Sequence, residues 1–162
     1  MSRYQMKQQW LSWGDDYIVR DASGRDSFFI DGKAWSWGNK LSFQDMAGRE
    51  LAFISQKVFS WGPTYEVYRS GQLIAVVKKS LFTLFRAEFT VDVPGPQDLV
   101  AEGDFWDHEY TFARHRQTVA TVSKTYFSWT DTYGIDVADG EDDVLIVAAA
   151  VIIDQCAHEK KK

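Results

Sequence analysis

The chain of 162 residues contains little cysteine, proline or glycine, and each shortage limits what the protein can be. It has one cysteine, Cys156, so no disulfide can form within the chain and a reducing compartment is expected. With 3 Pro and 11 Gly, and no Pro- or Ser-rich linker, we expect a single domain over residues 1–162. A net charge of −5 argues against sequence-independent binding to nucleic acid.

Several sequence features of enzymes and membrane proteins are also missing. No Gly-x-Gly triplet, Walker A loop or Gly-x-Ser-x-Gly elbow occurs, so neither a nucleotide-binding loop nor a hydrolase nucleophile is indicated. The first residues lack the apolar core of a secretory signal. The longest apolar run, 144–153, would span about 15 Å as a helix, half of a bilayer core. We expect a cytoplasmic protein that has no transmembrane segment, no cofactor and no enzymatic activity.

What the chain does have is aromatic residues, 7 Trp, 7 Tyr and 11 Phe, together with many short alternating segments. Residues 86–93 alternate cleanly, placing Ala87, Phe89, Val91 and Val93 on one face of a strand. Turn signals such as Ser70-Gly71 separate such segments at short intervals. The pattern predicts about twelve short strands and no helix before residue 141.

The apolar run 144–153 decides the fold. Its central alanines and the acids that precede it, Glu141, Asp142 and Asp143, favour a helix over a buried strand. A helix that is apolar on every face must be enclosed on every side. Barrels of about eleven strands leave room for a central helix. The sequence therefore predicts a mainly β protein, a closed antiparallel barrel of about twelve strands around a hydrophobic C-terminal helix.

Two regularities indicate an internal two-fold repeat. Ser-Trp-Gly recurs every 24 residues, around Trp13, Trp37 and Trp61, and a divergent copy contains Trp129. Residues 52–67 also align without gaps with residues 120–135, and seven of the sixteen positions are identical. Convergent strand composition is the alternative explanation. We expect the four tryptophans to pack the barrel interior or its rim rather than to line a ligand pocket.

Segments along the whole chain resemble the LURP-one-related family, which includes the bacterial YxjI-like proteins and belongs to the tubby C-terminal-like superfamily with the phospholipid scramblases. The segments are 4–8, 31–33, 40–45, 64–69, 89–96, 107–110 and 129–143. The resemblance implies a twelve-stranded barrel around a hydrophobic C-terminal helix. It also implies a molecular function that is largely unassigned, although tubby binds phosphoinositide head groups and scramblases are proposed to bind calcium before their terminal helix.

Basic residues near the Ser70-Gly71 hairpin are one candidate site. Charge-assisted contacts from such side chains suit phosphate, and lysines on outward strand faces also serve solubility. The candidate lipid- or anion-binding residues are Lys57, Arg69, Lys78, Lys79 and Arg86. The resemblance gives no residue-by-residue match to the tubby head-group site.

Acidic residues form two further candidates. Asp136, Asp139 and Glu141 lie in the stretch before the helix and are candidate calcium ligands, although Ala138 and Gly140 break the EF-hand spacing. A turn with a helix cap is the alternative. A second group, Asp104, Asp107, His108 and Glu109, could bring two carboxylates together on a strand, or form a solvated turn and strand start.

These observations favour a non-enzymatic binding or scaffold barrel whose ligand and partners are unassigned. The first alternative is a protein that binds phosphoinositide or another anionic lipid and lies at the membrane surface. The second is a metal-dependent or calcium-responsive protein that uses the acidic segment 136–143.

Overall fold

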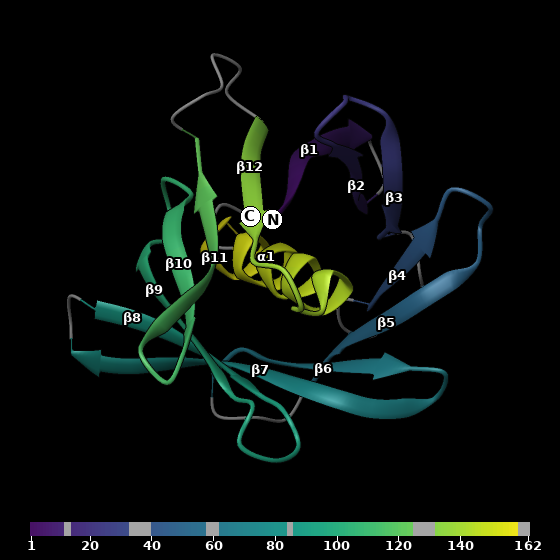
Figure 1. The fold of residues 1–162 in the computed structure, drawn as a ribbon. Helices are drawn as coiled ribbons and strands as arrows, with labels where there is room; N and C mark the ends of the chain where they lie inside the picture. The colour runs from purple at the N-terminus through teal and green to yellow at the C-terminus, as the bar shows by residue number, and fades with distance from the viewer. Residues whose placement is uncertain (12–13, 33–39, 58–61, 84–85, 125–131, 159–162) are drawn as a thin grey trace.

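A computed structural model describes residues 1–11, 14–32, 40–57, 62–83, 86–124 and 132–158 (Figure 1). Side chains are described for all of these except 8–11, 14, 15, 81–83, 86, 87 and 158. The elements are β1 (Ser2–Leu11), β2 (Gly14–Asp21), β3 (Asp26–Asp31), β4 (Lys40–Asp45), β5 (Glu50–Gln56), β6 (Thr64–Arg69), β7 (Gln72–Thr83), β8 (Arg86–Asp92), β9 (Leu99–Asp104), β10 (Glu109–Arg114), β11 (Gln117–Ser123), β12 (Thr132–Val137) and α1 (Asp143–His158).

The strands form a closed barrel in which each strand pairs with its neighbours in the sequence and β1 closes the ring against β12. The pairs are antiparallel, as short hairpin connections require. Alternation decides which side chains face inward: Phe89 and Val91 of β8 are buried, whereas Thr90 between them is only half-buried. The predicted barrel of about twelve strands is confirmed.

The helix α1 occupies the middle of the barrel, as Figure 1 shows. Every residue from Ile146 to Ile153 is at most 1% exposed, and α1 packs against β5, β6, β7 and β12. The helix interpretation of the apolar run is confirmed, because a segment with no polar face is stable only when the sheet surrounds it. In the described ranges no helix is long and apolar enough to cross a membrane.

The two halves that align in the sequence lie on different sides of the ring. The hairpin β5–β6 and the hairpin β11–β12 are six strands apart in the barrel order. Ala52 and Ala120, which correspond in the alignment, are both buried, and so are Tyr65 and Tyr133. Corresponding residues thus face the same core, although common origin of the two halves stays a prediction.

Candidate functional site

The acidic segment before α1 crosses one end of the barrel, which we call the entry rim, and each of its carboxylates meets a group from the wall. Asp136 accepts two hydrogen bonds from Arg3, at 2.7 and 3.0 Å. Glu141 accepts two from Nη1 of Arg114, at 2.7 and 2.9 Å. The remaining contacts are Asp139 with the Met1 amine, Asp142 with Arg69 and Asp143 with the Tyr4 hydroxyl.

Asp142 also caps the helix. Its Oδ1 accepts a hydrogen bond from the Leu145 amide at 3.1 Å, and its carbonyl accepts one from Ile146 at 3.0 Å. Asp143 adds a negative charge to the first turn, where the helix dipole favours it. The segment therefore forms the turn and helix cap that its sequence allowed.

The structure does not gather Asp136, Asp139 and Glu141 around one point, because Asp136 pairs with Arg3 on the outer face, Asp139 with the Met1 amine and Glu141 with Arg114. In the part of the chain that the structure describes, no group of three or more His, Cys, Asp or Glu side chains is placed to hold a metal ion. A calcium ion at this segment would have to compete with the guanidinium groups of Arg3 and Arg114. The calcium site stays a prediction.

The predicted basic group is divided between the two ends of the barrel. Arg69 lies at the entry rim and pairs with both oxygens of Asp142 at 3.0 Å. Lys57 and Lys78 instead flank Thr64 on the outer face near the start of β6, where the Lys57 amide bonds the Thr64 carbonyl and Lys78 pairs with Thr64 in register. Lys79 follows Lys78 on β7, and its amide bonds Pro63. Arg86 begins β8, and its side chain lies outside the described part.

The second acidic group forms the turn between β9 and β10, as its turn interpretation predicts. The Asp107 amide donates to Asp104 at 3.0 Å, and Glu109 begins β10, where it accepts hydrogen bonds from Ser123 and Lys124. The two carboxylates of Asp107 and Glu109 therefore do not converge on one ligand. His108 behaves differently from its neighbours: its φ is 55° and its side chain is buried.

His108 enters the barrel from the turn that joins β9 to β10, and the two strands approach closely just before this turn. Gly103 has a φ of 140°, and a Cβ there would lie 2.6 Å from the Glu109 carbonyl oxygen and the Tyr110 Cα. Only glycine therefore lets β9 and β10 approach so closely at this position. The imidazole then stacks on the Tyr133 ring, with ring centroids 4.3 Å apart.

Inside the barrel His108 meets Asp154, a buried carboxylate in the last turns of α1. The His108 Nε2 lies 2.5 Å from Asp154 Oδ1, and the Tyr17 hydroxyl donates to Asp154 Oδ2 at 2.8 Å. The side chains of His108 and Asp154 are 9% and 4% exposed. We call these three residues the buried cluster. It joins the helix to β2 and to the β9–β10 turn.

Two further tyrosines surround the buried cluster. The side chains of Tyr110 and Tyr133 are buried in the barrel interior. Their pKa values are raised well above the ordinary value for a phenol, mainly by burial and secondly by the charge of Asp154. Neither hydroxyl has a hydrogen-bond partner among the described residues. At the entry rim, the pKa of Tyr4 is raised to about 12. Burial is the largest cause, and the hydrogen bond to Asp143 is the second.

The sequence interpretation missed the buried cluster, because its members are far apart in the chain: His108 and Asp154 are 46 residues apart and Tyr17 and Asp154 are 137 apart. One signal was present. Asp154 directly follows ten apolar residues of a helix that was expected to be enclosed, and a carboxylate carried into such a core needs a partner.

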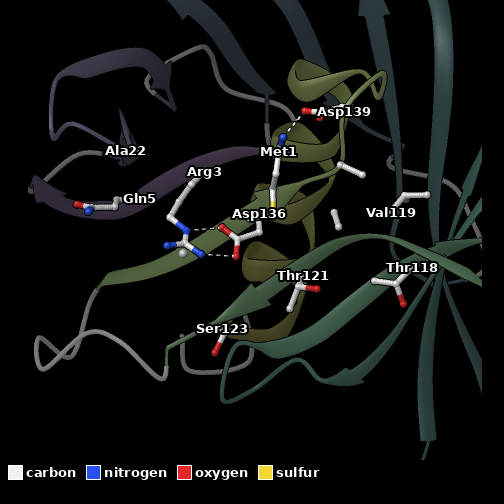
Figure 2. A pocket seen from close by; sticks show the side chains of 13 residues that line it. Met1, Arg3, Gln5, Ala22, Thr118, Val119, Thr121, Ser123, Asp136 and Asp139 are labelled. Carbon is white, nitrogen blue, oxygen red and sulfur yellow. Dashed lines mark hydrogen bonds and ion pairs between the residues drawn. The ribbon is translucent and has the colours of Figure 1, made fainter.

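The outer face carries a groove over β1, β11 and β12, which we call the outer groove (Figure 2). Its volume is about 820 Å³. Gly134 of β12 lies in register between Gln5 of β1 and Ser123 of β11, and in the next row Asp136 lies between Arg3 and Thr121. The absence of a side chain at Gly134 hollows the face at its middle, and polar side chains stand on both sides.

The four tryptophans expected to pack the barrel, Trp13, Trp37, Trp61 and Trp129, lie outside the described residues. Trp106, in the β9–β10 turn, is 48% exposed.

A closed antiparallel barrel with an apolar helix through its centre defines the class of the protein. The model of the LURP-one-related family matches residues 2–154, so the chain belongs to that family. It is 29% identical over 153 residues to the uncharacterized protein YxjI of Bacillus subtilis (strain 168), covering 94% of this chain and 92% of that protein. The X-ray structure of a protein from Arabidopsis thaliana has the same fold, with a TM-score of 0.66 and 15% identity over 94% of this chain and 90% of that one.

Proposed function

We propose that this protein is a non-catalytic binding barrel that takes its ligand on the outer face, in the outer groove. The proposal depends on where the structure leaves room for a ligand: outside the barrel and not inside it. The helix fills the lumen, with every residue from Ile146 to Ile153 at most 1% exposed, whereas the outer groove offers about 820 Å³. Ligand sites of proteins generally measure 300–1,000 Å³.

The chemistry of the outer groove suits a polar ligand without a large net charge. The amide of Gln5 and the hydroxyls of Thr118, Thr121 and Ser123 donate and accept hydrogen bonds. Among the described lining residues the guanidinium is that of Arg3, and it is matched by the carboxylate of Asp136. None of its lining side chains is a histidine or a cysteine, so an acyl-transfer nucleophile with its base is not among them.

The test is a screen of short peptides and polar small molecules against ¹⁵N-labelled protein by NMR. We expect shifts centred on the amides of Gln5, Ser123 and Gly134. Gly134→Leu fills the hollow from an ordinary strand position and abolishes the shifts, whereas Thr90→Leu, on the outer face of β8, leaves them unchanged. Shifts that cluster elsewhere, or a compound that is consumed during the screen, would refute binding at this groove or its non-catalytic character.

A second candidate function, binding to an anionic lipid surface, is favoured by the arrangement of Lys57 and Lys78 on either side of Thr64. Lys78 pairs with Asp92 at 3.4 Å, and both side chains are about half exposed, so this pair is weak and open to competition. Arg69 is engaged with Asp142 at the opposite rim and is not part of this lysine pair.

Vesicle flotation tests this candidate. Vesicles with phosphoinositide, with phosphatidylserine or with neutral lipid alone distinguish head-group recognition from general attraction. We expect the double variant Lys57→Glu, Lys78→Glu to lose flotation and the matched double charge reversal Arg25→Glu, Arg49→Glu, at the β2–β3 and β4–β5 turns, to keep it. Absence of the unaltered protein from the floating fraction at low salt would end this proposal.

A further inference from the structure

The chain contains two Asp-Gly steps, Asp31-Gly32 and Asp139-Gly140. Glycine has no Cβ, so its amide nitrogen can approach the γ-carboxyl carbon of the preceding aspartate with little hindrance. Such a step isomerises in a folded protein when the glycine amide is not engaged and the backbone around it has room to rotate. The two steps differ in both respects.

At Asp31-Gly32 the fold engages the glycine amide. The Gly32 amide donates a hydrogen bond of 2.9 Å to Oδ1 of Asp16, and Asp16 is fully buried. Asp31 itself belongs to β3, where it pairs in register with Ser42 of β4. Attack by the Gly32 nitrogen therefore requires that its bond to Asp16 opens and that the end of β3 leaves the sheet.

At Asp139-Gly140 the surroundings are open. The step is the centre of a turn that the Glu141 amide closes with a hydrogen bond of 3.3 Å to the Ala138 carbonyl, and no described group accepts a hydrogen bond from the Gly140 amide. Gly140 has a φ of 84°, and a Cβ there would meet nothing within 4 Å beyond its chain neighbours. The Asp139 side chain is 88% exposed. The central peptide of this turn can therefore rotate until its nitrogen faces the Asp139 carboxyl, without breaking the bond that closes the turn.

We propose that Asp139 is a modification site, at which the folded protein converts aspartate to isoaspartate. The Gly140 nitrogen attacks Cγ of Asp139, the new C–N bond forms, and the carboxyl hydroxyl leaves as water with the amide proton. One water molecule then opens the cyclic succinimide at either carbonyl. Opening at the α-carbonyl leaves the chain linked through Cγ, so the product has the composition of the original protein and one more carbon in its backbone.

The position of the turn gives this modification its consequence. Residues 138–142 connect β12 to α1, and Asp142 caps the helix by accepting from the Leu145 amide. The additional backbone carbon lengthens this connection directly before the cap. Asp139 also lines the outer groove (Figure 2), so the isomer changes the shape of one end of that groove. The modification itself does not depend on what the groove binds.

The test compares folded protein with protein unfolded in urea, both incubated at physiological temperature. Endoproteinase Asp-N cuts before aspartate and not before isoaspartate, so mass spectrometry of the digest measures isomerisation at Asp31 and at Asp139 in one sample. In urea we expect comparable rates at the two sites, because glycine follows both. Folding should change the rate at Asp139 by less than about threefold and slow the rate at Asp31 about tenfold or more, because the Gly32 bond must open first.

An isoaspartyl methyltransferase with labelled S-adenosylmethionine counts isoaspartate in the intact chain, because it transfers the methyl group to the new α-carboxylate and releases S-adenosylhomocysteine. Asp139→Glu keeps the charge but would have to form a larger ring, so incubated folded protein should lose most of its methyl incorporation. Asp31→Glu is the matched control and should keep it. Protection of Asp139 by folding as strong as that of Asp31 would overturn the proposal, and so would unchanged incorporation in Asp139→Glu.

Discussion

At its first turn α1 is held by arginines and a tyrosine that reach in from the entry rim, whereas in its last turns it is held by the buried cluster. The rim contacts are numerous and partly exposed; in the pair of Arg69 and Asp142 the side chains are 41% and 40% exposed. The buried cluster has few members, and its pair of His108 and Asp154 is almost sealed from water. Carboxylates before and within the helix therefore lie in two different dielectric environments.

The difference teaches where the barrel is robust and where it is sensitive. Solvated ion pairs contribute about 0–1 kcal/mol each, and losing one leaves its partner in water. A buried pair contributes little in net terms, yet removal of one partner costs about 3–5 kcal/mol, because the other charge stays behind. We therefore expect the entry rim to tolerate substitution better than the end that contains the buried cluster.

The largest effect is expected between the two ends, where neither rim nor cluster supplies a partner. Val147 is fully buried, so Val147→Asp places a lone carboxylate against the wall and costs several kcal/mol of a total stability of roughly 5–15 kcal/mol. Val144→Asp, at the partly buried first turn, is the matched control and folds. Circular dichroism and size-exclusion chromatography measure whether each variant folds. A soluble, folded Val147→Asp protein would show that the helix is not enclosed.

Next in size is the loss of one partner of the buried cluster. Asp154→Ala leaves His108 buried without its acceptor, and we expect the free energy of unfolding in urea to fall by about 3–5 kcal/mol. His108→Leu combined with Asp154→Leu removes both buried polar groups, so the double variant recovers much of that loss. A double variant less stable than Asp154→Ala would mean that the pair stabilises the fold in its own right.

High pH acts on the same end through the tyrosines. The unfolded chain releases phenol protons near pH 10, whereas Tyr110 and Tyr133, whose pKa values are raised by burial and by Asp154, keep theirs in the folded barrel. Their contribution to stability is therefore complete below about pH 10 and is lost as the pH rises above it. Urea unfolding between about pH 9 and pH 11 measures this, and Tyr133→Phe should reduce the decline. If the stability of Tyr133→Phe falls with pH as much as that of the unaltered protein, other groups cause the loss of stability.

The sequence alone predicts the barrel but not the buried cluster, because the barrel follows from local patterns and the cluster from contacts between distant segments. Period-two alternation and an apolar run at residues 144–153 are local patterns, and each has one stable solution. Asp154 and His108 meet only because twelve strands close around α1 and the β9–β10 turn places His108 inside the barrel, which no local pattern specifies. The division of Lys78 and Arg69 between two barrel ends likewise depends on strand direction and length rather than on their proximity in sequence.

The smallest effect is expected at the entry rim, and it completes the contrast between the two ends. Arg69→Gln removes a half-exposed pair with Asp142, so the free energy of unfolding should fall by about 1 kcal/mol or less, and about 1 M salt should remove most of the difference. Arg114→Gln affects a less exposed pair, with side chains 21% and 16% exposed, so its effect should be larger and less sensitive to salt. Urea unfolding at low and high salt compares the two variants. A loss at Arg69 that equals the loss at Asp154 and persists in high salt would mean that the two ends are held with similar strength, because exposure would then not govern the effect.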